Sequence, residues 1–418
     1  MHISTKHKWT PVLGFVALLF VIGAGQGVAR DLPYAFNTRH YTIKTDAGKR
    51  IAHLVAQHME SIYGEYARRF RDYGLKEHKR FEVRVYSKEK DYNHAVPEDL
   101  VGSTGAFLPD QKWLGAYLEG HTEEEAFRTL YHEGFHQFLF SCVTRNVPLW
   151  LNEGFAVYFS EATWDGDSFE TGLVPRNRIF VVKRAIKEKR HISFEKLFER
   201  KSEQWLGHVR NSESLSSLQY CEAWSVVHFL LHSERGRYRK RLFAYLKKLS
   251  QDKDAEKAFR ASFGVDYRRL ERKWIQYVKK LQPGATELCR SNMELLGTIA
   301  LGCYGSARRF RSLEHLRREL SNPRRQWKVV SGYGRKVSSE DKKSAAGLFR
   351  CPYDRSKAKI SYVLLKNKNT GLPELFCNHH KGVVVRGYYQ RGENGKLQMK
   401  VETIVRATLP QELLRKLE

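Results

Sequence analysis

Two histidines four residues apart, with a glutamate directly after the first, occur in the stretch YHEGFHQF at residues 131–138. The histidines are His132 and His136, and the glutamate is Glu133. Residues four apart on a helix are neighbours on one face, so on a helix the two imidazole rings can reach a common point. The question is therefore whether the chain builds a helix here.

A helix is expected because its start is marked upstream. Thr122 is followed three residues later by Glu125, the T-x-x-E pattern of a capping box, and acidic residues in the first turn suit the positive end of the helix dipole. The histidines then fall in the middle of this helix. A second helix is expected from Pro148 to Ser160, because proline is favoured at the start of a helix.

The second helix offers a third metal ligand. A zinc ion that holds a reactive water needs three protein ligands and an open position, and two histidines supply only two. Glu153, in PLWLNEGFAVYF, lies 17 residues after His136, which leaves room for a turn between the helices. Two imidazoles, a carboxylate and a water suit a catalytic site better than a structural one.

Each of these residues also has a structural interpretation. A histidine in the middle of a helix is commonly a buried residue with satisfied hydrogen bonds, and Glu153 could pair with an arginine. His228 and His232 repeat the four-residue spacing without an adjacent glutamate. We expect this second pair to serve packing, because a metal site also needs an acid or a thiolate nearby.

H-E-x-x-H followed by W-L-N-E-G-F-A resembles the gluzincin metallopeptidases, in particular the aminopeptidase-type branch and the related peptidase-MA-like proteins of unassigned substrate. The resemblance covers about residues 38–282. It implies one zinc ion per chain and Glu133 as the general base. It also implies that Tyr220, in LQYCEAWSVVHFLL, stabilises the oxyanion. The implied zinc ligands are His132, His136 and Glu153.

Two departures from typical aminopeptidases favour an endopeptidase. The interval between His136 and Glu153 is shorter, and nothing matches the G-x-M-E-N segment that grips a substrate amino terminus. In such folds the strand before the H-E-x-x-H helix forms a sheet edge. We therefore expect WLGAYLE, residues 113–119, to bind extended substrate by β-addition, the alternative being an ordinary covered edge.

The first 29 residues have the pattern of a signal peptide. Lys6 and Lys8 precede an apolar run at 12–22, and a small-x-small site predicts cleavage after Ala29. We expect an exported protein, periplasmic or secreted, with no transmembrane span once the signal is removed. The alternative is an uncleaved membrane anchor, although the apolar run is short of the roughly 20 residues that span a bilayer.

The remaining chain is expected to have an α+β fold. A small mixed sheet packed on helices, followed by a mainly helical subdomain, forms a gluzincin-like domain at 30–282. Residues 283–350 are expected to be a basic irregular linker and residues 351–418 a small β-rich module. The strands expected before the histidine helix lie at 40–45, 80–87 and around Pro109, with a helix over 47–72; later helices are expected at 178–190, 217–233, 236–250 and 266–281.

Basic residues dominate the charge of the chain, which has a formal net charge of +27. Residues 301–350 alone hold 13 Lys and Arg against 4 Asp and Glu. Such a field favours an anionic envelope surface or polysaccharide as a partner, the alternative being a solvated surface that keeps the chain soluble. Nucleic acid is not an expected partner, because no recognition motif is present and export would separate the two.

All six cysteines follow the predicted signal, and an even number in an exported chain suggests disulfides, with 15 possible connectivities. Pairing in sequence order is the first hypothesis. None shows the C-x-x-C spacing typical of a structural zinc site. The predicted pairs are Cys142 with Cys221, Cys289 with Cys303, and Cys351 with Cys377.

The sequence thus predicts an exported zinc metallopeptidase that hydrolyses peptide or protein substrates with a zinc-activated water. The alternative is a non-catalytic, envelope-associated binding protein. It would use the zincin scaffold as a frame and the basic C-terminal region to bind polyanions.

Overall fold

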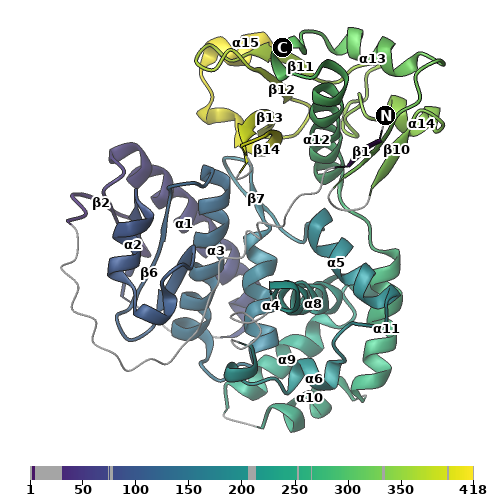
Figure 1. Cartoon of the computed structure of the whole chain (residues 1–418). Coiled ribbons are helices and arrows are strands. Elements are labelled where there is room, and N and C mark those ends of the chain that lie inside the picture. Colours follow the sequence, from purple (N-terminus) through teal and green to yellow (C-terminus); the bar gives the residue numbers. More distant parts are fainter. Residues whose placement is uncertain are drawn as a thin grey trace.

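A computed structural model describes residues 2–4, 31–73, 75, 79–205, 213–251, 254–264, 266–331, 335–392 and 395–417. Most of the predicted signal peptide lies outside these residues, so cleavage after Ala29 stays a prediction. Figure 1 shows a larger part that carries the first sheet and helices α1–α11, and a C-terminal part from α12 onward. Among the described residues, no helix combines the length and apolar character needed to cross a bilayer.

The first sheet has five strands in the order β2-β3-β4-β6-β5. β3, β4 and β6 are parallel, whereas β2 and β5 are antiparallel to their neighbours. The strand at 40–45, the strand at 80–87 and the hairpin around Pro109 are confirmed. The strands are β2 (Tyr34–Asn37), β3 (Tyr41–Thr45), β4 (Phe81–Tyr86), β5 (Gly105–Leu108) and β6 (Trp113–Tyr117).

Successive strand residues point to opposite sides of the sheet, and the apolar side chains on both faces are covered by helices. On β6, Leu114 and Ala116 join the main core with α1 (Lys49–Phe70) and α3 (Glu123–Phe138). Trp113 and Tyr117 face a smaller core with α2 (Glu89–Ala95). The sheet thereby fixes one face of α3, the helix that carries the histidine pair.

The prediction that residues 113–119 form the sheet edge is wrong. β6 pairs with β4 on one side and with β5 on the other, so its backbone groups already have partners. The edge strand next to β6 is β5, whose four residues are all buried. The chain doubles back in a hairpin before α3, and this extra strand takes the outer place.

A helical subdomain follows α3 and confirms the predicted helices at Pro148–Ser160 and beyond. α8 lies at its centre, in contact with α4, α5, α9 and α11. Two shorter helices, α6 and α10, were not predicted. The elements are α4 (Leu149–Ser160), β7 (Thr163–Trp164), β8 (Phe169–Glu170), α5 (Arg176–Lys187), α6 (Phe194–Phe198), α8 (Glu213–His232), α9 (Arg239–Leu249), α10 (Ala255–Phe263) and α11 (Tyr267–Lys280).

Residues 283–350 are not an irregular linker. They begin with the 20-residue helix α12 (Ala285–Tyr304), whose apolar side is buried in one core with residues of the following sheet. Linker and module are therefore one folded C-terminal module, in which the basic residues occupy the surface of ordered elements. Its helices are α12, α13 (Leu313–Ser321), α14 (Lys342–Gly347) and α15 (Gln411–Leu417).

Two sheets complete the C-terminal module. The larger is an antiparallel meander, β11-β12-β13-β14, which confirms a β-rich region near the C-terminus. In the smaller sheet, β9 lies between β10 and β1, and β1 belongs to the stretch that the predicted cleavage after Ala29 would remove. The strands are β1 (His2–Ser4), β9 (Lys328–Val330), β10 (Lys336–Ser338), β11 (Val363–Lys366), β12 (Pro373–Cys377), β13 (Val383–Arg391) and β14 (Leu397–Val405).

The C-terminal module contacts the first turn of α3. Glu124 accepts hydrogen bonds from Arg290 of α12 at 3.0 Å and from the Thr403 backbone N–H of β14 at 2.7 Å. Arg128, one turn later, also pairs with Glu124, at 2.9 Å. Burial would raise the pKa of Glu124, but the charges of Arg290 and Arg128 lower it to about 2. A buried ion-pair network therefore joins the module to the start of the histidine helix.

The three predicted disulfides are wrong, because all six cysteines are free. Cys289 and Cys303 lie 14 residues apart on α12, which separates them by about 21 Å along a helix, far beyond disulfide reach. The Cys142 thiol interacts with Tyr63, whereas that of Cys221 faces Arg178. Cys351 and Cys377 lie near each other in a larger group, together with Cys289 and His380.

Candidate metal centre

The helix α3 begins as the sequence predicts. The Thr122 side chain accepts a hydrogen bond from the Glu125 backbone N–H, and the Glu125 carboxylate accepts one from the Thr122 backbone N–H. This capping box satisfies two backbone donors that would otherwise lack partners. On the helix that begins here, His132, Glu133 and His136 are all buried.

Three ligand atoms converge between α3 and α4. Glu153 Oε2 lies 3.3 Å from His132 Nε2 and 3.6 Å from His136 Nε2. The imidazole rings of the two histidines are 4.8 Å apart between centroids. The structure thus brings together His132, His136 and Glu153, as the sequence predicts.

These three atoms are buried and have no hydrogen-bond partner among the described residues. Buried polar atoms are normally paired, and leaving them unpaired costs free energy. The structural interpretation therefore does not fit, because the histidines are not satisfied core residues and Glu153 has no arginine partner within the described residues. Two imidazole nitrogens and a carboxylate oxygen are a donor set that suits zinc, so the residues present fit that ion.

The His136 ring is oriented by a residue that the sequence analysis did not assign. Asn152 Oδ1 lies 2.8 Å from His136 Nδ1. Because an amide oxygen can only accept, Nδ1 carries the proton and Nε2 presents its lone pair toward Glu153. Asn152 directly precedes Glu153 in the W-L-N-E-G stretch. Its position next to a candidate ligand is the sequence signal that could have identified it.

Burial sets the protonation of the group in the absence of a metal. It lowers the pKa of His132 far below the usual value, helped by the neighbouring His136, and lowers that of His136 to about 4. It raises the pKa of Glu153. Neutral imidazole is the form that binds a metal, so burial favours the ligand state of both histidines.

Glu133 lies beside the three ligand atoms without joining them. Both of its carboxylate oxygens are buried, and among the described residues the one protein group placed to donate to them is the Phe107 backbone amide, outside ideal hydrogen-bond geometry. Burial raises its pKa strongly, the negative charge of Glu153 raises it further, and the Phe107 backbone amide of β5 opposes the rise. A carboxylate held in this way is a stronger proton acceptor than an exposed one.

Tyr220 lies on α8 and is fully buried. Its ring packs edge-to-face on Trp205, with 5.3 Å between centroids. Burial raises the pKa of Tyr220 most, and the charges of Glu153 and Glu133 raise it further. Its hydroxyl therefore stays protonated in the electrostatic neighbourhood of both carboxylates.

Close packing between α4 and α8 fixes the helix that carries Glu153 relative to the helix that carries Tyr220. At Gly154 an added Cβ would lie 2.6 Å from the Ala223 carbonyl oxygen and 2.7 Å from Val227 Cγ2. Only glycine allows the two helices to approach this closely. The glycine after Glu153 thus has a packing role that the motif alone does not reveal.

The second histidine pair behaves as a packing pair, as predicted. His228 Nε2 lies 3.1 Å from the Gly172 carbonyl oxygen and its Nδ1 lies 2.8 Å from the Tyr277 hydroxyl. His232 Nε2 is 3.0 Å from the Tyr158 hydroxyl. The spacing is that of His132 and His136, but here protein groups satisfy the ring nitrogens.

Comparison with models of known protein families identifies the family of the chain. The model of the peptidase MA superfamily matches residues 68–280, slightly more than half of the chain. The chain belongs to the peptidase MA superfamily. Its fold is metallopeptidase-like, and the superfamily association supports peptidase activity in general, with peptides or proteins as the substrate class. A comparison with curated proteins finds no match.

The matched range contains all of the predicted site residues. It begins near the end of α1 and ends with α11, so it includes α3, α4 and α8. The C-terminal module lies outside it. The superfamily match therefore covers the group of His132, His136 and Glu153, whereas the C-terminal module has to be explained from its own residues.

Proposed function

We propose that this peptidase MA superfamily chain is an exported zinc-dependent endopeptidase that hydrolyses peptide bonds. One observation carries the proposal. His132 Nε2, His136 Nε2 and Glu153 Oε2 lie within 4.8 Å of one another, buried and unpaired among the described residues. The buried Glu133 carboxylate lies close enough to Glu153 for the two charges to interact.

His132, His136 and Glu153 would hold the zinc ion and leave a position open to water and substrate. The chemistry that a bound zinc ion supplies is Lewis-acid activation of water and of the substrate carbonyl. Asn152 keeps Nε2 of His136 unprotonated for binding. No other protein group in the described part of the chain competes for the three ligand atoms.

Glu133 is the proposed general base. Its buried carboxylate, next to His132 on α3, would accept the proton of the attacking water and then donate that proton to the leaving nitrogen of the peptide. Tyr220 is the proposed oxyanion donor. Since its hydroxyl remains protonated, it can donate a hydrogen bond to the oxygen that gains negative charge.

The C-terminal module supplies a proposed anionic-surface contact. Its exposed Lys and Arg side chains would hold the exported enzyme near a polyanion of the envelope. They include Arg308, Arg309, Arg311, Arg318, Arg324, Lys328, Lys336, Lys342 and Lys343. Binding to anionic vesicles or sulfated polysaccharide should weaken as salt rises, whereas neutral vesicles should not bind. Salt-insensitive binding would contradict an electrostatic contact.

The test of the peptidase proposal is Glu133→Gln. The variant should bind as much zinc as the wild type, and its cleavage rate of a proteome-derived peptide mixture should fall by about 10²–10⁴-fold. His136→Ala should lose this zinc. His228→Ala is the matched control, because it removes one member of the satisfied histidine pair and should keep zinc bound at the centre.

Two results would contradict the proposal. Unchanged cleavage by Glu133→Gln would remove Glu133 as the base. Zinc binding at this centre without any peptide cleavage by the wild type would favour the alternative, in which the zincin scaffold is a frame for a binding protein.

A further inference from the structure

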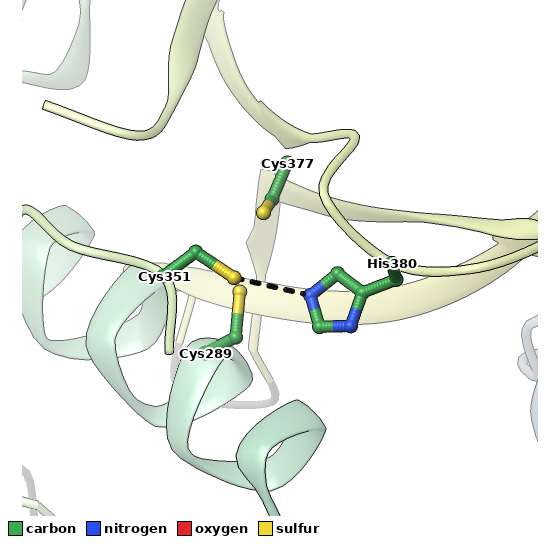
Figure 2. A group of neighbouring side chains, drawn as sticks. All are labelled: Cys289, Cys351, Cys377 and His380. Atoms are coloured by element: carbon green, nitrogen blue, oxygen red, sulfur yellow. Dashed lines mark hydrogen bonds between the residues drawn. The ribbon is translucent and has the colours of Figure 1, made fainter. Parts of the chain in front are cut away.

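A second group of metal-binding side chains lies in the C-terminal module, outside the range that the family model matches. It consists of Cys289 on α12, Cys351 in the loop after α14, Cys377 at the end of β12, and His380 in the turn that follows. Figure 2 shows the three sulfur atoms and the imidazole facing one another across a common centre. Segments almost a hundred residues apart in sequence meet here.

The distances suit one tetrahedral metal ion. All four ligand atoms lie within 4.8 Å of one another, and Cys351 Sγ is 3.5 Å from His380 Nε2. In a tetrahedral zinc site with ordinary bond lengths, a sulfur and a nitrogen ligand are separated by about 3.6 Å, and two sulfurs by about 3.8 Å. The group already has nearly the size that the ion requires.

All four side chains are buried, with exposed fractions of 0–5%. Four protein ligands complete a tetrahedron and leave no position for substrate or water, which is the pattern of structural zinc. A catalytic role would require an open position. The group is therefore suited to holding the module together.

Neighbouring groups orient the ligands. His380 Nδ1 lies 3.4 Å from Thr286 Oγ1, which can accept a hydrogen bond from Nδ1–H and so leave Nε2 with a free lone pair. The Cys351 sulfur accepts a hydrogen bond from the Tyr353 backbone N–H, and the Cys377 sulfur accepts one from that of His379. Amides that point at a sulfur stabilise the thiolate, the form that binds metal.

The loop after Cys351 is fixed independently of any metal. Asp354 accepts hydrogen bonds from the Ser356 backbone N–H at 2.8 Å and from the Ser361 hydroxyl at 2.6 Å. The carboxylate is buried, and the Asp354 backbone N–H donates a hydrogen bond to the Cys351 carbonyl oxygen at 3.0 Å, so the turn after Cys351 is ordered. A preformed loop reduces the ordering that ligand convergence would otherwise require.

A disulfide accounts for less of this geometry. It would join two of the three cysteines, and it would leave the third thiol and the His380 ring nitrogen facing it without a role. A metal uses all four. We propose that Cys289, Cys351, Cys377 and His380 bind one structural zinc ion that joins α12, the loop after α14 and the end of β12.

The sequence contains a partial signal for this site. Cys377 and His380 have C-x-x-H spacing, which places two ligands on one turn. The other two ligands come from positions 289 and 351, and no local pattern connects them. For this reason the C-x-x-C criterion did not detect the group.

The test uses the purified protein carrying His136→Ala, which removes a ligand of the first centre. It should retain one zinc ion per chain, and replacement by Co²⁺ should give a strong thiolate-to-cobalt charge-transfer band in the near ultraviolet. Adding Cys377→Ser should remove the band and the zinc. Adding Cys303→Ser, a cysteine of the same helix α12 outside the group, should keep both.

A second measurement guards against misfolding of the serine variant. Titration of the His136→Ala protein with a mercurial, which modifies thiols, should release one zinc ion per chain into a colorimetric chelator. The proposal is overturned by zinc-free His136→Ala protein, by a cobalt spectrum without thiolate charge transfer, or by a disulfide between any two of Cys289, Cys351 and Cys377 in peptide mass mapping.

Discussion

The two metal-ligand groups of this peptidase MA superfamily chain differ in how the fold brings them together. His132, His136 and Glu153 come from two consecutive helices, and they leave a buried carboxylate, Glu133, next to the ligands. The cysteine group comes from three distant segments and offers four ligand atoms, enough to fill a tetrahedral zinc site. One arrangement suits chemistry, because a position stays open, and the other suits stability, because none does.

This difference also explains what could be predicted. A ligand set within one helix pair leaves a short periodic pattern, so the helix, its cap and the candidate ligands His132, His136 and Glu153 could be found from sequence. The C-terminal group depends on tertiary contacts between α12 and β12, which leave no such pattern. Its cysteines were therefore assigned to disulfides, and α12 was assigned to a linker.

Apart from Glu133→Gln and His136→Ala, the substitution expected to lower the cleavage rate most is Tyr220→Phe. Removing one oxyanion donor typically lowers kcat by about 10²–10³-fold, and the variant should keep its zinc because Tyr220 is not a ligand. The measurement is kcat on a cleaved peptide together with zinc content. Tyr245→Phe, another buried tyrosine of the helical subdomain, is the control. Equal losses in both variants would show that Tyr220 acts only through packing.

A second prediction concerns Glu124, which joins the C-terminal module to α3. Its pKa is lowered from 4.5 to about 2, so the carboxylate contributes stability above pH 4.5 that is lost as the pH falls toward 2. A shift of this size corresponds to about 3 kcal/mol. Glu124→Gln should lower the free energy of unfolding by roughly that amount at pH 7 and flatten its pH dependence between 2 and 5.

Urea unfolding followed across this pH range measures the Glu124 effect. Glu123→Gln, at the more exposed neighbouring position, is the control and should change stability by no more than about 0.5 kcal/mol. If the free energy of unfolding had the same pH profile in the wild type and in Glu124→Gln, the contacts of Glu124 with the C-terminal module would not stabilise the fold.

The third prediction compares the groups that orient a ligand histidine in each centre. Asn152→Ala should weaken zinc binding at the first centre by about 10–100-fold, because His136 loses its hydrogen-bond partner. Thr286→Ala should have a smaller effect at the cysteine group, since its contact with His380 is longer, at 3.4 Å. Chelator competition measures the zinc affinity of each centre in the two variants. A larger loss of affinity in Thr286→Ala than in Asn152→Ala would contradict the prediction.

Parts of the fold also show where sequence patterns end. The alternation in β3 and β4 and the capping box at Thr122 identify elements whose signals are local. The position of β6 inside the sheet was missed, because strand order depends on pairing between strands rather than on the pattern of one strand. The close contact at Gly154 was also hidden, since it involves a helix more than sixty residues later.

The most direct test of the first centre is a crystal structure with anomalous diffraction data collected at the zinc absorption edge. The account predicts a peak in contact with His132 Nε2, His136 Nε2 and the Glu153 carboxylate, with Glu133 close by but not coordinated. A map without density at this point from zinc-saturated protein, or a Glu153 side chain turned to an arginine, would contradict it.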